Sequence, residues 1–237
     1  MRRDGVVGSR LALVALAVAA AATIGLAARE LAASVRFASI SYLSDRLQDG
    51  AQLDAAVLSR YAQEAMAVSN EGVCRSDIVG DGLRVILADL DRQNSFARYD
   101  AWAAAMENAD RYIKHAIGCS PSDGNLWLRL AMVRWAIAEQ PPLLSFLLQQ
   151  SVRYAPANGE VVKARFIVWR KASEQTLDLA AEALNADLRT LLLYAPAWEA
   201  ARTLKDPGDL LSPRVFAVFD RLPEERKKVL KASGFKL

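Results

Sequence analysis

Two cysteines are the residues of this sequence whose type and spacing most directly predict chemistry. Cys74 and Cys119 stand in loop-like segments on either side of a helical block, and the chain has no third cysteine. Because an even pair outside the cytoplasm is expected to oxidise, we predict a disulfide that closes a loop of roughly 45 residues and stabilises the fold by about 3–4 kcal/mol. Two independent buried thiols are the alternative. The pair lacks a CxxC spacing and a companion ligand, which argues against a metal site.

The other polar residues do not form a catalytic pattern. His115, the single histidine, lies inside a predicted helix, where a lone histidine is typically a surface or interface residue. Asp77 and Asp81 share a helix face, but such carboxylates are usually solvated. The sequence contains no GxSxG, HExxH or phosphate-loop pattern, and the GDG at 80–82 follows a helical rather than a strand pattern. We therefore predict a protein that is not an enzyme, with no catalytic residue, cofactor or metal.

Tryptophans raise the alternative of a surface that stacks on sugars. Their spacing of roughly one per predicted helix pair favours packing between helices instead. Trp135 and Trp169 are the candidates for a partner-binding or glycan-binding surface, and burial of both would exclude the glycan hypothesis. The five tryptophans are Trp102, Trp127, Trp135, Trp169 and Trp198.

A basic run, RKKVLK at 226–231, is a further candidate surface. It could contact anionic lipid or an acidic partner, although four cations on a charged terminal helix are more typical of a solvated cap. The net charge of +3 is too small to indicate nucleic-acid binding. We therefore expect protein partners and a membrane, not nucleic acid.

The N-terminus predicts how these residues are placed relative to a membrane. Residues 1–10 form a short basic tail, and 11–28 are eighteen uncharged residues. At about 1.5 Å per residue they span roughly 27 Å, close to a bilayer core of about 30 Å. A cleaved signal peptide is the alternative, but the apolar run exceeds the usual signal length and Leu26 stands where a small residue is needed. We favour an uncleaved single-pass anchor.

Arginines on both sides of the anchor make its orientation less clear than usual. The positive-inside rule favours a cytoplasmic N-terminus, because the downstream arginines are mixed with acids. Together with the disulfide, this predicts a bacterial inner-membrane anchor with a periplasmic body. The arginines are Arg2, Arg3 and Arg10 before the anchor and Arg29, Arg36 and Arg46 after it.

The composition predicts an all-α body. The chain is 53% hydrophobic, with only 12 Gly and 8 Pro, and apolar residues recur at helical spacing. We expect membrane-proximal helices in 29–95, with an Asn94–Ser95 cap before the following helix, and capping helices in 205–237. The predicted helices are 30–48, 52–68, 77–92, 96–117, 124–138, 142–154, 159–170, 173–194, 196–204, 213–221 and 223–233.

Three similar interruptions separate the helices of 96–204. They read CSPSDGNLW from Cys119, YAPANGEVV from Tyr154 and YAPAWEAA from Tyr194. Their prolines lie 35 and then 40 residues apart, each interval holding about two helices. Such spacing indicates stacked helix pairs, because one pair cannot bury its apolar face alone.

The residues around the first interruption resemble the tetratricopeptide-repeat family. Trp127 and Leu130 fall where the family has Trp and Leu, Ala131 replaces its Gly, and Arg134 stands where an aromatic is expected. The resemblance implies stacked antiparallel helix pairs over 96–204, a tetratricopeptide-like solenoid. The second helices of the successive pairs carry Ala109, Ile113 and Ala116, then Leu144, Leu148 and Ser151, then Leu184, Leu188 and Leu191.

A second, shorter resemblance links the chain to a cellular process. CRSD at 74–77 and CSPSDGNLWLRLA at 119–131, behind an anchor, resemble small membrane-anchored accessory proteins of bacterial exopolysaccharide biosynthesis and secretion. The resemblance implies a non-enzymatic, membrane-tethered periplasmic scaffold or adaptor for the envelope polysaccharide machinery. A glycan-binding module using exposed aromatics, or an envelope assembly factor or chaperone, are the alternatives.

Overall fold

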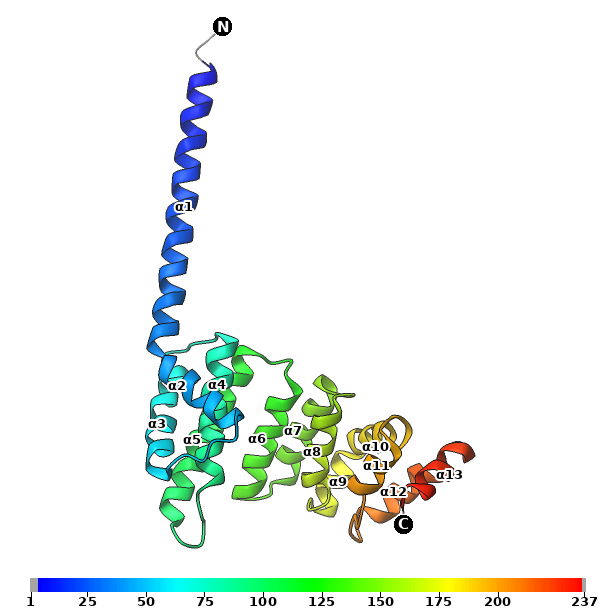
Figure 1. Cartoon of the computed structure of the whole chain (residues 1–237). Helices are drawn as coiled ribbons and strands as arrows, with labels where there is room; N and C mark the ends of the chain where they lie inside the picture. Colours follow the sequence, from blue (N-terminus) through cyan, green and yellow to red (C-terminus); the bar gives the residue numbers. More distant parts are fainter. Residues whose placement is uncertain (1–3, 236–237) are drawn as a thin grey trace. The chain divides into compact units, whose positions relative to one another are not determined.

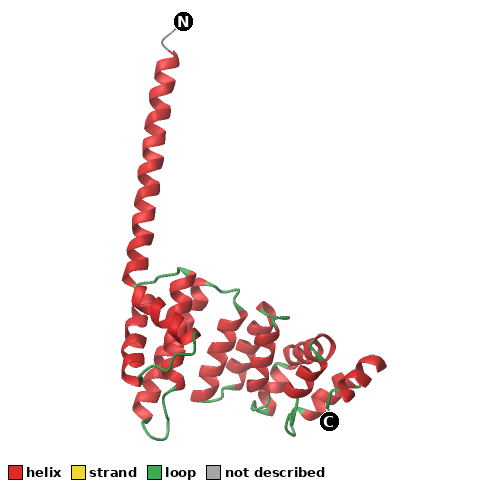
Figure 2. Cartoon of the chain, viewed as in Figure 1, coloured by secondary structure: helices red, strands yellow, loops and turns green. Residues whose placement is uncertain are grey.

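The computed structural model describes residues 4–235, and every regular element in that range is a helix (Figures 1 and 2). The chain divides into two compact units, one ending at Asp89 and one beginning at Leu90. Arg2 and Arg3 of the predicted basic tail lie outside the described residues. The helices are α1 (Asp4–Arg36), α2 (Ala38–Gln48), α3 (Ala55–Asn70), α4 (Ser76–Asp91), α5 (Tyr99–Cys119), α6 (Gly124–Ile137), α7 (Pro141–Tyr154), α8 (Gly159–Trp169), α9 (Glu174–Leu179), α10 (Ala181–Arg189), the π-helix η1 (Thr190–Tyr194), α11 (Ala197–Thr203), α12 (Ser212–Phe219) and α13 (Glu224–Ala232).

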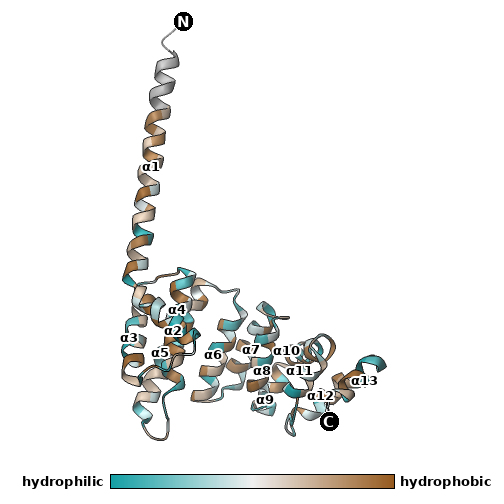
Figure 3. Cartoon of the chain, viewed as in Figure 1, coloured by the Kyte–Doolittle hydropathy of each residue, from teal (hydrophilic) through white to brown (hydrophobic). Residues whose placement is uncertain are grey.

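Helix α1 contains the predicted anchor and is longer than 11–28. Its stretch Ala12–Arg36 is long and apolar enough to cross a membrane, a property that a signal sequence shares. The apolar side chains of this stretch are uncovered, with Leu16 and Ile24 each 70% exposed. Figure 3 shows the resulting run of hydrophobic residues along α1.

The predicted helix 30–48 is two helices, because Phe37 interrupts it. Phe37 has φ −102° and ψ 11°, and its ring is buried in the first unit. Ile40 and Leu43 follow it into the core, whereas Leu31 and Val35 stay on the exposed side of α1. The apolar pattern of 30–48 therefore includes residues with two different surroundings.

The last turns of α1 are fixed to the loop between α3 and α4 by arginines. The Arg75 guanidinium donates to the Ser34 hydroxyl at 2.7 Å and to the Glu30 carbonyl at 3.0 Å, and it pairs with Asp77. Arg36 pairs with Glu71 in the same loop. Hydrogen bonding by Asp77 raises the pKa of Arg75 above its ordinary value, so the arginine stays charged. These contacts therefore fix the end of α1 to the rest of the first unit.

Helix α5 begins three residues later than the sequence predicts. The Asn94 side chain accepts from the backbone N–H groups of Phe96 and Ala97, at 2.9 and 3.1 Å. It closes a separate turn before the helix, and Arg98 occupies the position that precedes the first helical residue. The predicted Asn94–Ser95 helix cap is therefore wrong.

The small and apolar residues that suggested helix pairs are buried in the second unit. Ala109, Ile113 and Ala116 of α5 have no exposed surface, and α5 packs against α6. Helix α6 in turn contacts α7 and α8. In α7, Leu144, Leu148 and Ser151 are buried, whereas Phe146 is 48% exposed.

The predicted helix 173–194 is interrupted twice. Ala180, at φ −110° and ψ 21°, separates α9 from α10, and the chain then widens into η1. The predicted apolar face is nevertheless buried, because Leu177, Leu184, Leu188 and Leu191 are each at most 2% exposed. The periodicity was informative about burial, but it carried no sign of the two breaks.

Candidate functional site

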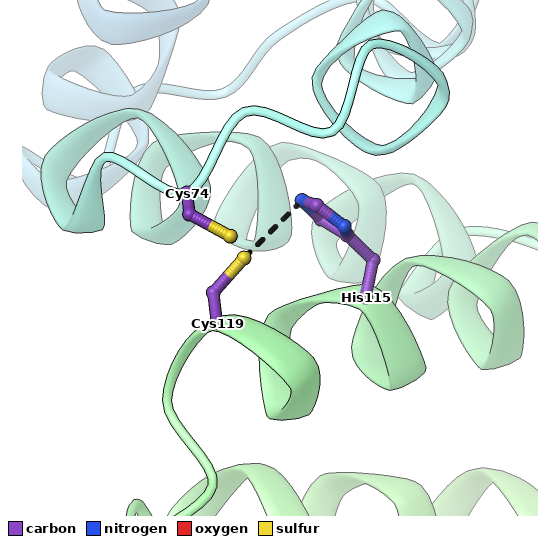
Figure 4. Close-up of side chains that lie close together, drawn as sticks. All are labelled: Cys74, His115 and Cys119. Atoms are coloured by element: carbon purple, nitrogen blue, oxygen red, sulfur yellow. Dashed lines mark hydrogen bonds between the residues drawn. The ribbon is translucent and has the colours of Figure 1, made fainter.

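Cys74 and Cys119 form a disulfide, as the sequence predicts (Figure 4). The alternative of two independent thiols is therefore wrong. His115 lies one turn before Cys119 on α5, with its Nε2 3.6 Å from the Cys119 Sγ. Thiolates, not disulfide sulfurs, ligate metals, so the oxidised pair gives His115 no companion metal ligands. His115 is half-buried beside the disulfide, with its ring edge against Tyr112.

The first two interruptions share the same cap chemistry. The Asp123 carboxylate accepts from the Asn125 N–H at 2.9 Å, and Asn158 accepts from the Val161 N–H at 3.3 Å. Each therefore begins the next helix, α6 or α8, at a glycine. Asp123 is thus the residue that caps α6.

The two glycines that follow these caps have different surroundings. A Cβ at Gly124 would lie 2.6 Å from the Ala155 Cβ and 2.7 Å from the Ser151 carbonyl oxygen. A Cβ at Gly159 would meet nothing within 4 Å. The Ser151 hydroxyl also donates to the Gly124 carbonyl at 2.8 Å. Gly124 thus permits a close backbone approach between the first and second interruptions.

A buried ion pair lies beside the second interruption. The Arg165 guanidinium binds both oxygens of Asp187, at 2.6 and 2.7 Å, and neither side chain is exposed. Arg165 also donates to the carbonyl oxygens of Ser151 and Ala155, at 3.2 and 3.1 Å. The Trp169 indole N–H donates to Asp187 at 2.9 Å. These contacts join α7, α8 and α10 through one polar network inside an apolar core.

Burial and pairing act in opposite directions on Asp187. Removal from water raises its pKa, and the hydrogen bonds from Arg165 and Trp169 oppose that rise without cancelling it. We interpret the carboxylate as ionised at neutral pH, because it accepts from the Nε and Nη2 of a guanidinium that does not deprotonate. The network has the geometry of a structural support for the helices it joins.

The two tryptophans predicted to lie on a binding surface, Trp135 and Trp169, differ in their burial. Trp169 has no exposed surface, so its prediction as part of a partner or glycan surface is wrong. Its indole N–H donates to Asp187 inside the core, and this hydrogen bond makes the complete burial of the ring favourable. Trp135 is half-buried, and the Lys171 ammonium lies 5.3 Å from its ring centroid. Trp198, which the sequence did not single out, is 57% exposed.

The basic run 226–231 is largely paired within the protein. Arg226 donates to the carbonyl oxygens of Leu192 and Ala195, each at 2.6 Å, at the third interruption. Lys227 and Lys228 form ion pairs with the glutamates three residues earlier, at 2.8 and 2.9 Å. This arrangement agrees with a terminal cap better than with a free basic patch.

Glu139 is a further polar support that the sequence did not indicate. Its Oε1 accepts from the Ser173 N–H at 2.9 Å, the Ser173 hydroxyl at 2.6 Å and the Thr176 hydroxyl at 2.5 Å. Burial raises the pKa of Glu139, but the hydrogen bonds from Ser173 and Thr176 outweigh it and lower the pKa overall. The carboxylate thereby fixes the start of α9.

Comparison with protein-family models, curated proteins and solved structures finds no match to this chain. The resemblances to tetratricopeptide repeats and to polysaccharide accessory proteins therefore stay predictions.

Proposed function

We propose that the chain is a non-enzymatic adaptor, tethered to a membrane by α1, that presents a helical-repeat body to partner proteins in an oxidising compartment. In a bacterial cell this places the N-terminus in the cytoplasm and the body in the periplasm. From the sequence resemblance, we propose that this adaptor is an accessory protein of cell-surface polysaccharide synthesis or export.

The tether is supported by the contrast between the two ends of α1. Its apolar side chains are uncovered over Ala12–Val35, while Glu30, Ser34 and Arg36 are bound by the loop that contains Arg75. A helix with a lipid-seeking portion and a protein-bound end suits an anchor that holds its body near the bilayer surface.

The single observation that carries the adaptor is the spacing of polar contacts in the second unit. Side-chain hydrogen bonds between residues at least 30 apart in this unit span 30–37 residues, around the 34 residues of one tetratricopeptide helix pair. Other contacts, such as Arg165 with Asp187 and Ser151 with Gly124, span 22 and 27 residues. A narrow range for the longer contacts is expected when equivalent positions of successive helix pairs face each other in a stack. Examples are Glu139 with Ser173 (34 residues), Pro156 with Thr190 (34), Leu192 with Arg226 (34), Lys163 with Glu199 (36), Asp178 with Arg214 (36) and Arg170 with Thr203 (33).

The oxidising compartment is supported by the disulfide. Cys74 is exposed, so a reducing cytosol would have access to the bond. Disulfides persist in the periplasm and in other extracytoplasmic compartments, and cytosolic thiols are kept reduced.

Exposed apolar side chains give the adaptor surface its chemistry. Phe146, Ile167 and Phe216 are 48%, 50% and 57% exposed. If a partner covered one of these side chains, the burial of its apolar surface would contribute roughly 25 cal/mol per Å² to binding. They are therefore the positions at which we expect a partner to contact the repeat body.

In-cell photo-crosslinking tests the adaptor. A benzophenone amino acid would replace Phe146, Ile167 or Phe216, one at a time, in the full chain, with Lys228 as the exposed, ion-paired control position. We expect at least one apolar position to give a discrete adduct with an envelope protein, and Lys228 to give none. Absence of adducts from all three apolar positions, or the same adduct from Lys228, would contradict the proposal.

A further inference from the structure

We propose that a pocket beside Trp198 binds an acidic sugar residue of a glycan. The pocket has a volume of about 410 Å³ and lies in the second unit. Its walls come from α11, the turn that follows it and the end of the C-terminal helix. They are formed by Trp198, Ala201, Arg202, Lys205, Asp206, Ser233 and Gly234. The size falls in the range of about 300–1,000 Å³ typical of small-ligand pockets. This site is separate from the protein surface proposed above and does not depend on it.

The indole of Trp198 supplies the stacking surface. It is 57% exposed, and within residues 4–235 its N–H has no hydrogen-bond acceptor. The Arg202 guanidinium lies 5.0 Å from the ring centroid. An exposed tryptophan with an unused donor suits a ligand that has both an apolar face and polar groups at its edge. The C–H face and the hydroxyl rim of a pyranose ring have this character.

The cations of the pocket select for an acid. The side chains of Arg202 and Lys205 are exposed and form no ion pair among the described residues. Elsewhere in the second unit, by contrast, Lys163, Lys227 and Arg214 are each paired with a carboxylate. An unpaired guanidinium beside an aromatic face can bind a carboxylate with two parallel hydrogen bonds.

Two further side chains fit hydroxyl groups. Asp206 offers carboxylate acceptors, and Ser233 offers a hydroxyl that donates and accepts. Asp206 is the described non-glycine residue with a positive φ, at 50°, a strained conformation that Asp tolerates better than most residues. Sugar hydroxyls can donate hydrogen bonds to this carboxylate, whereas the ionised side chain of an acidic peptide has no donor to offer it. The mixture of stacking surface, cations and hydroxyl acceptor therefore favours an acidic sugar over a simple anion.

Calorimetric titration of the full chain in detergent tests the site, with trigalacturonate and triglucuronate as probes. Maltotriose is the neutral control, and hexaglutamate is the acidic-peptide control. We expect at least one uronate trimer to bind, and both controls to bind at least about tenfold more weakly. Trp198→Ala and Arg202→Gln should each weaken uronate binding at least about tenfold, with unchanged thermal unfolding because both residues are exposed.

A matched pair of variants locates the site. Lys171 lies over Trp135 as Arg202 lies over Trp198, so Lys171→Gln and Trp135→Ala remove a similar pair outside the pocket. They should leave uronate binding unchanged. Loss of binding in these controls would place the sugar at Trp135, and equal affinity for hexaglutamate would identify an acidic-protein site. Either result, or no binding of both uronate trimers up to about 10 mM, overturns the proposal.

Discussion

Replacing Arg165 with methionine should destabilise the second unit far more than removing any surface ion pair. The variant leaves the Asp187 carboxylate buried with only the Trp169 N–H as donor. It also removes the donors to the Ser151 and Ala155 carbonyls. Breaking a fully buried pair in this way costs about 3–5 kcal/mol. At roughly 2–4 °C per kcal/mol for a chain of this size, the midpoint of thermal unfolding should fall by about 6–20 °C.

The matched control is Arg214→Met. Arg214 meets Asp178 at 2.6 Å, the same distance as the shortest Arg165–Asp187 contact, but the Asp178 side chain is 63% exposed. Solvent screening limits such a pair to about 0–1 kcal/mol. The double variant Arg165→Met with Asp187→Leu should recover much of the loss, because no unpaired charge remains.

The cost of Arg165→Met should also depend on pH. Without the arginine, burial raises the pKa of Asp187 further. A carboxyl whose folded pKa lies above its unfolded value favours folding at low pH and loses that contribution as pH rises through the folded pKa. The variant should therefore lose more stability at pH 7 than at pH 5. Circular dichroism melts of the full chain in detergent measure this, and a midpoint shift equal to that of Arg214→Met would refute the account of the buried network.

Three other changes test separate parts of the structure. Cys119→Ser, which also frees Cys74, should lower stability by about 3–4 kcal/mol relative to the oxidised protein, and an unchanged denaturant midpoint would oppose a stabilising disulfide. The ionised Glu139 contributes stability that is present above its ordinary pKa of 4.5 and is lost as the pH falls through its lower folded pKa. Glu139→Gln should therefore lose less stability than the parent protein as the pH falls below 4.5 in denaturant titrations, and an equally steep acid loss in the variant would contradict this. Gly124→Ala should destabilise the protein by about 1–3 kcal/mol, because the new methyl group would collide with backbone atoms. Gly159→Ala should be neutral or stabilising in the same thermal melts, and identical effects of the two variants would exclude the proposed close approach.

The sequence allowed most helices to be predicted, because apolar periodicity and caps are local. Asp123 and Asn158 are of residue types that commonly cap helices, and each caps the helix that follows it. The breaks at Phe37 and Ala180 were not predictable in the same way, since neither residue is a helix breaker by type. Tertiary packing decides them: Phe37 enters the core of the first unit, and Ala180 is buried beside α10.

The candidate sites were predictable only where one residue type fixes the chemistry. Cys74 and Cys119 could be paired because the chain offers no other cysteine. The partner of Arg165 lies 22 residues away on another helix, and no local pattern identifies it. The sequence does not distinguish the burial of Trp169 from that of Trp198. Trp169 can be buried because Asp187, 18 residues away on another helix, accepts a hydrogen bond from its indole N–H.

Thiol trapping in intact cells tests the central claim most directly. Cells producing the full chain would be treated with a mass-tagged maleimide before and after reduction, and their membranes would be washed with carbonate. We predict that Cys74 and Cys119 accept the tag only after reduction, and that the chain stays in the washed membranes with α1 uncleaved. Tagging of both thiols before reduction, or release of a shortened chain into the soluble fraction, would contradict a membrane-tethered body in an oxidising compartment.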